Sequence, residues 1–184
     1  MKKVFIASLM AASLAPVFAH AADGTLQFNG NVAATTCQLS AGPGGTLAFT
    51  MADARVDSLS KQGDHFKGGN FNVNLVKCGG TARTVQLGFD ANLVGINATS
   101  GRMLNTGSAT NVEVALRATD ADLTDLKLGT GNARSATVTS VVTGTGATAD
   151  STAVVPLIAY YVATADGVTA GTVKSQVQFN IYQP

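Results

Sequence analysis

Apolar residues recur at every second position in several short runs of this chain, and this alternation restricts its fold more than any other feature. A period of two places successive side chains on opposite faces of an extended strand, so that one face of each run can enter a core. Glycine-rich and Asp-Gly turns separate the runs, and only 12% of the residues are charged, which is typical of strands joined by turns. The sequence therefore predicts an all-β fold. The alternating apolar residues are Phe71, Val73 and Leu75; Val85, Leu87 and Phe89; Val112, Val114, Leu116 and Ala118; and Val173, Val177, Phe179 and Ile181.

One later run differs, because residues 153–163, AVVPLIAYYVA, are apolar throughout. This pattern predicts either a strand covered on both faces or a core strand bent at Pro156. Tyr160 and Tyr161 lie inside the run, so we interpret them as core residues rather than as aromatics that stack on sugars.

Outside the strands, the sequence predicts one short helix and several turns. The helix is expected over residues 51–59, with Thr50 as its N-cap. The number and spacing of the runs favour an immunoglobulin-like β-sandwich of about seven strands. Turns are expected at residues 42–45, 68–69, 79–80 and 166–167, where glycines occur.

The first 21 residues have the features of a secretion signal. Lys2 and Lys3 form a positive start, residues 4–18 are apolar, and residues 19–21, AHA, form a small-x-small cleavage pattern. The apolar run of 15 residues is short for a membrane span. We expect cleavage after Ala21 and export of the remaining 163 residues, which are enough for one domain with a sizeable core.

Cys37 and Cys78 are the only cysteines, and both lie beyond the leader, so they would enter an oxidising compartment. We interpret them as one disulfide, which stabilises the fold by about 4 kcal/mol when only chain entropy is considered. Because each cysteine ends an alternating run, the bridge would join neighbouring early strands.

Charge and composition argue against several classes of function. The net charge is +1 for the whole chain and −1 without Lys2 and Lys3, so neither nucleic acid nor an anionic membrane is a favoured partner. His65 is the one histidine beyond the leader, in a segment expected to be a loop, and no nucleophile motif lies near it. The acidic run at Asp120, Asp122 and Asp125 lacks the glycine and the final glutamate of a calcium loop, so a turn is expected there. We therefore predict no enzymatic activity, cofactor, metal site or small-molecule substrate.

Four features together make the chain similar to one family of exported proteins. The segment GTLQFNGNV follows the leader, and the two cysteines lie about 40 residues apart. The segment FNVNLVKC, residues 71–78, has Phe, an apolar residue and Leu at alternate positions, with Cys three after the Leu. The last run has Gly171 fourteenth from the end and Tyr182 near the end. In these features the chain resembles a pilin of the chaperone-usher (type 1 fimbrial) family, of the major-subunit type, although the family tyrosine is usually penultimate and here Pro184 makes it third from last.

The resemblance implies that residues 34–184 form an incomplete immunoglobulin-like sandwich that lacks its last strand. Residues 22–33 would be an N-terminal extension, called here the donor arm, that fills the resulting hydrophobic groove of a neighbouring copy. Burying the three large apolar side chains of the arm would contribute about 5 to 9 kcal/mol. Gly30 would fit where a side chain overpacks a shallow groove. The inward residues of the arm are Gly24, Leu26, Phe28, Gly30 and Val32, and those of the acceptor groove are Val173, Val177, Phe179 and Ile181.

The resemblance also implies partners and a location. Gly171 and Tyr182 would belong to the C-terminal motif used with a periplasmic chaperone, and an outer-membrane usher would export the subunit. Copies of the chain or related pilins would join in a head-to-tail polymer, a cell-surface fimbria that supports adhesion. The alternative is a self-complete secreted β-sandwich of the carbohydrate-binding lectin or adhesin type, in which residues 25–32 are an ordinary first strand.

Overall fold

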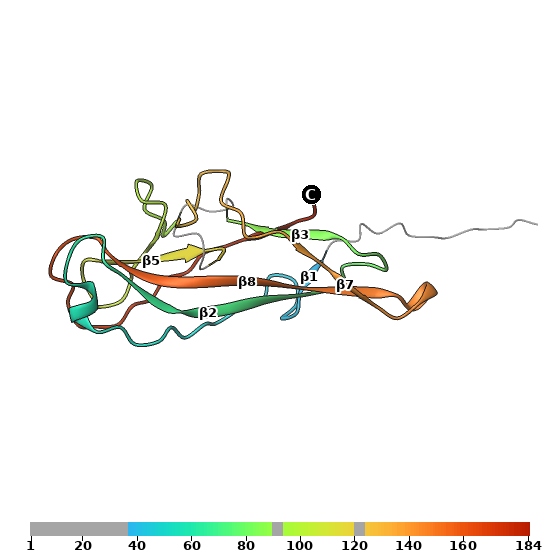
Figure 1. Ribbon diagram of the computed structural model, residues 1–184, viewed down its shortest axis with the longest axis horizontal. Helices are drawn as coiled ribbons and strands as arrows, with labels where there is room; N and C mark the ends of the chain where they lie inside the picture. The colour runs from blue at the N-terminus through green and yellow to red at the C-terminus, as the bar shows by residue number, and fades with distance from the viewer. Residues whose placement is uncertain (1–36, 90–93, 120–123) are drawn as a thin grey trace, which may run out of the picture. The chain divides into compact units, whose positions relative to one another are not determined.

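The computed structural model describes residues 37–89, 94–119 and 124–184, and these residues form two antiparallel sheets, so the all-β prediction is confirmed (Figure 1). The larger sheet has the order β1 (Gln38–Leu39), β2 (His65–Val76), β8 (Asp150–Ala163), β5 (Val112–Arg117) and β4 (Met103–Leu104), and β7 (Val141–Thr143) also pairs with β8. The smaller sheet has the order β6 (Val138–Thr139), β3 (Thr84–Gly88) and β9 (Asn180–Tyr182).

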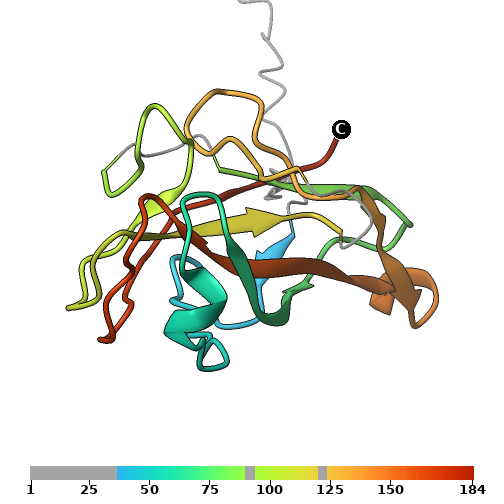
Figure 2. The same ribbon diagram turned by 60° about the vertical axis from the view of Figure 1, so that its left-hand side comes forward.

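The main core lies between the two sheets and is built from the alternating runs (Figure 2). In β2, Val73 and Leu75 are buried, while Asn72 and Asn74, which alternate with them, are exposed. Val85 and Leu87 of β3 are fully buried in the same cluster, which also holds apolar residues of β5 and β8. The period-two pattern therefore identified the inward faces of β2 and β3 correctly.

The continuously apolar run forms part of β8, and its two halves differ. Up to Leu157 buried and exposed residues alternate, whereas residues 157–163 are all buried, so the prediction of a strand covered on both faces is confirmed for that half. Pro156 lies opposite Asn72 of β2, between the part of β8 paired with β7 and the part paired with β5. A residue without an N–H group is tolerated there because neither of those two ladders reaches it.

The described residues form nine strands where about seven were expected. Part of the difference arises at Ser140, where the chain passes from β6, which pairs with β3, to β7, which pairs with β8. Ser140 is buried and is held by two hydrogen bonds to the backbone of Arg83, of 2.8 and 2.9 Å. One extended segment is thereby divided between the two sheets.

The helix expected over residues 51–59 is wrong over most of its length. Only Val56–Leu59 is helical, as a single 3-10 turn whose N-cap position is Arg55 and not Thr50. The residues before it run along β2 instead, and the Ala52 N–H donates to the Gly68 carbonyl at 2.7 Å. A second 3-10 turn spans Gly146–Thr148. None of the helical segments in the described part of the chain has the length and apolar character of a membrane span.

The turn expected at residues 68–69 is also wrong, because both glycines lie inside β2. The register with β8 shifts between Lys67 and Gly69, which marks a bulge, and Gly69 has a φ of 140°. A Cβ atom on Gly68 would collide with the side chain of Met51. These glycines do not form a turn. They allow the neighbouring segment to approach the strand closely.

Cys37 and Cys78 form a disulfide, as predicted. The bridge lies beside the short ladder in which Gln38 pairs with Val76 and Leu39 pairs with Leu75. It therefore joins the start of β1 to the end of β2, which are the neighbouring early strands that the sequence indicated.

Candidate strand-acceptor site

The C-terminal segment keeps its alternation, although its strand is shorter than predicted. Among the residues that the structure describes, this segment forms a ladder only in β9, in which Ile181 lies opposite Leu87 and Asn180 lies opposite Gly88. Over the whole segment, however, the predicted inward side chains are half-buried against the main core: Val173, Val177, Phe179 and Ile181. Gln178 and Asn180, which alternate with Val177, Phe179 and Ile181, are exposed. The segment thus presents a row of apolar side chains that packs against the core and remains partly exposed.

The start of this segment is held by a loop rather than by a strand, which explains the short ladder. The N–H of Thr106 donates to the Lys174 carbonyl at 2.8 Å, and that of Ala109 donates to the Thr172 carbonyl at 3.1 Å. Gly171 lies so close to this loop that a Cβ there would be 2.6 Å from the Ala109 nitrogen. A side chain at position 171 would therefore displace the loop that holds the row.

The other end is held through Tyr182. The guanidinium of Arg134 lies over its ring, and the ring also lies against Gly88, where a Cβ would collide with it. Beyond it, the Thr84 hydroxyl donates to the Pro184 carbonyl at 3.1 Å. The extra C-terminal residue thus has a defined contact with β3.

A second apolar segment was missed by the sequence reasoning. Leu47, Phe49 and Met51 alternate with Ala48 and Thr50 and run beside β2. The Phe49 ring stacks on Phe71 with centroids 4.9 Å apart, yet Leu47 and Phe49 each remain 39% exposed. Met51 packs against the same core as the C-terminal row. The alternation in LAFTMA was the available signal, and it was overlooked because Thr50 suggested a helix start.

The predicted donor residues Gly24, Leu26, Phe28, Gly30 and Val32 lie outside the described residues. The structure therefore describes only the candidate receiving side, which consists of two partly exposed apolar rows.

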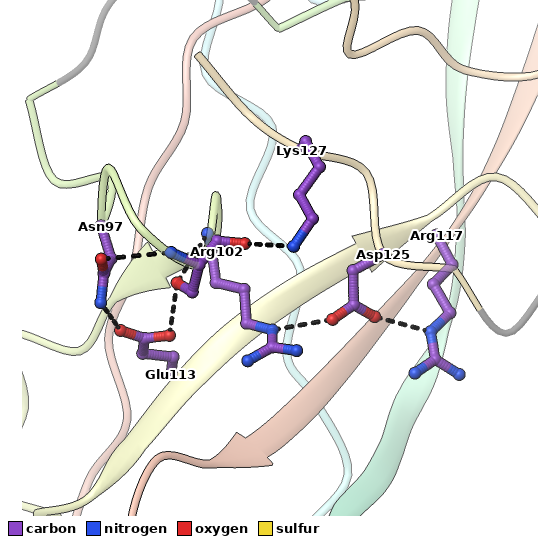
Figure 3. A network of polar contacts seen from close by, with 7 residues as sticks. Asn97, Arg102, Glu113, Arg117, Asp125 and Lys127 are labelled. Atoms are coloured by element: carbon purple, nitrogen blue, oxygen red, sulfur yellow. Dashed lines mark hydrogen bonds and ion pairs between the residues drawn. The ribbon is translucent and has the colours of Figure 1, made fainter. Parts of the chain in front are cut away.

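A separate polar network lies on the opposite face of β5 and accounts for Asp125 of the acidic run (Figure 3). Asp125 is buried and accepts hydrogen bonds from the Nε atoms of Arg102 at 2.7 Å and Arg117 at 2.9 Å. Buried Glu113 accepts from the Asn97 side-chain amide and, at 2.8 Å, from the Ser100 hydroxyl. The network ties the loops of residues 97–102 and 124–127 to the sheet. Asp120 and Asp122 lie outside the described residues.

The electrostatics of Asp125 follow from these contacts. Burial by itself would raise the pKa of its carboxyl group, but the hydrogen bonds and charges of Arg117 and Arg102 outweigh that effect and lower the pKa below its ordinary value. Asp125 is therefore an ionised partner of two arginines, and no group of three potential metal ligands occurs among the described residues.

Two further side chains bear on the alternatives considered from the sequence. His65 is exposed at the start of β2, so its expected place in a loop is wrong, and its ring lies 6.0 Å from that of Tyr160. Tyr160 and Tyr161 are 7% and 9% exposed, which confirms them as core residues. Their burial leaves neither ring available as a platform for a sugar.

Two sheets around one core, a disulfide between the first two strands and a half-open C-terminal row are features of a class of structural subunit. Comparison with known proteins identifies that class: the fimbrial protein family model matches residues 26–183. The chain is also 32% identical over 170 residues to the major fimbrial subunit SMF-1 of Stenotrophomonas maltophilia, covering 91% of this chain and 96% of that protein. The chain belongs to the fimbrial protein family. It is a non-enzymatic structural subunit of a surface fimbria.

Proposed function

We propose that the subunit polymerises by donor-strand exchange, in which residues 22–33 of one copy complete the sandwich of the next. The observation that carries the proposal is the row Val173, Val177, Phe179 and Ile181, which packs on the core but remains only half-buried. Apolar side chains in this state lose stabilisation that a covering strand would restore.

The second apolar row supports the same conclusion. Leu47 and Phe49 are exposed large apolar residues, and Met51 beside them packs on the core that also receives Val177 and Phe179. We infer that the donor strand lies over this shared core, between residues 47–51 and 176–181. Its backbone would then run beside residues 47–51 and 176–179, which lie outside the strands of the described part of the chain.

The donor arm has the complementary pattern. Leu26, Phe28 and Val32 share one face of an extended chain with Gly24 and Gly30, and the opposite face is polar. Insertion of this apolar face would bury the three large side chains, with the gain of about 5 to 9 kcal/mol given above. Each copy has both an arm and a receiving core, so the contact is heterologous and extends without closing.

Residues 1–21 would direct export and be removed after Ala21, which places the arm at the mature N-terminus. An empty receiving site would expose an apolar surface, so a periplasmic chaperone and an outer-membrane usher are the partners that the mechanism requires before assembly. Adhesion would then be supported by the assembled fibre rather than by a sugar site on this subunit.

A synthetic peptide of residues 22–33 tests the exchange directly. Subunit released from fibres in denaturant is refolded with the peptide, and we expect a stable one-to-one complex that survives SDS without heating. The matched peptide carrying Phe28→Asp should form little complex, because an ionised carboxylate would enter an apolar site. Equal complex formation by both peptides, or an unaided subunit that folds fully without either, would refute donor-strand exchange.

A further inference from the structure

A cluster of exposed apolar side chains lies at the end of the larger sheet that carries the disulfide. Val141 is 66% exposed and Val154 is 51% exposed. Val141 lies opposite Thr152, and in β8 Thr152, Val154 and Pro156 alternate with buried residues, so these side chains share the outer face of the sheet. We call Val141, Thr152, Val154 and Pro156 the disulfide-end patch.

One charged residue lies at the edge of this patch: Asp150, two positions before Thr152 in β8, is partly buried, and its carboxylate accepts from the N–H groups of Gly79 at 3.1 Å and Ser151 at 2.8 Å. The cross-strand neighbours of Val154 and Pro156 on β2 are Asn74 and Asn72, both exposed and uncharged. Exposed strands of free proteins are commonly protected by lysines or other charges, because bare apolar edges associate. Two exposed valines with uncharged cross-strand neighbours, in a subunit that assembles, are therefore suited to a permanent contact.

The patch lies near the root of the donor arm. The N–H of Cys78 donates to the Ser151 carbonyl at 2.9 Å, and Ser151 pairs with Val142 of β7. Cys37 is joined to Cys78 by the disulfide. Cys37, where the described domain begins after the arm, is thus linked through Cys78 and Ser151 to Thr152 of the patch.

Chain length then limits where a partner can lie. The arm ends at residue 33, and four peptide steps separate that residue from Cys37, a span of at most about 14 Å. Whatever accepts the arm is held within that distance of the disulfide. Tethering also gives a weak surface contact a high effective concentration.

We propose that the disulfide-end patch is a second contact surface between successive subunits, and that it packs against the copy that has accepted the donor arm. This inference rests on donor-strand exchange and adds a contact between folded domains to it. The patch stabilises the polymer without taking part in the insertion itself.

The test uses a patch variant that carries both Val141→Asp and Val154→Asp in one subunit. Its control is Val56→Asp. Val56 is 41% exposed and lies in the 3-10 turn beside the opposite end of β2 and β8, so it is a matched exposed valine remote from the patch (Figure 1). Peptide binding and fibre dissociation are measured for each variant. Because the peptide carries no folded domain, it reports insertion alone.

We expect all variants to bind the peptide of residues 22–33 within about twofold of the unaltered subunit. Fibres of the patch variant should release monomer at least about tenfold faster on heating, because about 1.4 kcal/mol of contact energy corresponds to that factor. Val56→Asp fibres should match the unaltered ones. Equal release rates for patch variant and unaltered fibres, or equal acceleration by Val56→Asp, would overturn the proposal.

Two further measurements keep the outcome decisive. If the aspartates impair peptide binding and hence folding, the milder pair Val141→Thr and Val154→Thr is used, with accelerated release again expected. Amide hydrogen exchange in β7 should be slower in fibres than in the peptide-completed monomer, and equal exchange would contradict a contact there. A peptide that fails to bind even the unaltered subunit refutes donor-strand exchange, whereas normal peptide binding with unchanged fibres and exchange refutes the patch alone.

Discussion

The guanidinium carbon of Arg134 lies 4.3 Å from the centroid of the Tyr182 ring, which also lies against Gly88. This contact holds the three-residue ladder of the C-terminal segment, in which Asn180 lies opposite Gly88. A slip of one residue would turn Phe179 and Ile181 outward and their polar neighbours inward. The pairing of Arg134 with Tyr182 therefore determines which side chains line the proposed acceptor site.

Replacing Tyr182 with Ala should destabilise the peptide-completed subunit by about 1 to 2 kcal/mol, because the cation–π contact and the packing on Gly88 are both lost. Tyr182→Phe keeps the ring and is the control, with an expected loss below about 0.5 kcal/mol. Denaturant unfolding measures both. If the phenylalanine variant loses as much as the alanine variant, the hydroxyl and not the ring holds the strand.

Gly88→Ala should cost about 1 to 3 kcal/mol, because the new methyl group would overlap the Tyr182 ring. The same substitution in a Tyr182→Ala background should cost much less, since the ring is gone and the other close atom, Arg134 Nη1 at 2.7 Å from the new Cβ, ends a flexible side chain that can move away. A double-mutant cycle on the unfolding free energies gives the coupling. Additive losses would show that the ring does not set the space at position 88.

In the donor arm, Gly30→Leu should slow peptide insertion by about tenfold or more, because an inward side chain overpacks a shallow site. Asn29→Leu adds the same side chain on the outward face and should leave the rate within about twofold. Stopped-flow fluorescence of labelled peptides measures the rates. Similar rates for the two peptides would contradict the predicted register of the arm.

Asp125→Asn should destabilise the subunit by roughly 3 kcal/mol at neutral pH, because two largely buried guanidinium groups lose their counter-ion. In the unaltered protein, the pKa of the Asp125 carboxyl is lowered by folding. The contribution of Asp125 to stability is therefore complete above the ordinary aspartate pKa and is lost as pH falls through the folded-state pKa. The stability difference between the two forms should therefore shrink only in acid, below about pH 4. A constant difference down to pH 2 would exclude Asp125 as the titrating group.

Removing the disulfide with Cys37→Ser and Cys78→Ser together should lower the unfolding free energy by about 4 kcal/mol, because it closes a loop of 41 residues. The double substitution avoids a free thiol. Unfolding of the peptide-completed subunit measures the loss, and mass spectrometry should find no alkylated cysteine in the unaltered, unreduced protein. A loss below about 1 kcal/mol would show that the bridge constrains little of the unfolded chain.

Local pattern determined a large part of this protein. The alternation at Val73, Leu75, Val85 and Leu87 fixed the inward faces of β2 and β3, because a period of two leaves each strand one way to bury its apolar side. The two cysteines fixed the disulfide, since only one pairing exists. The alternation of the C-terminal row likewise survives in its half-buried side chains.

Only the tertiary structure determined the conformation and contacts of residues whose role depends on a partner that is distant in the sequence. Gly68 appeared to be a turn residue, but it gives space to Met51 beside a bulged strand. Residues 47–52 pack along β2 instead of starting a helix, because Phe71 offers Phe49 a stacking surface that no local propensity reveals. The C-terminal segment forms so short a ladder because the carbonyls at its start, those of Thr172 and Lys174, accept hydrogen bonds from the loop at residues 104–109. Side-chain period is encoded within each segment, whereas close approach and hydrogen-bond partners are set by where other segments come to lie.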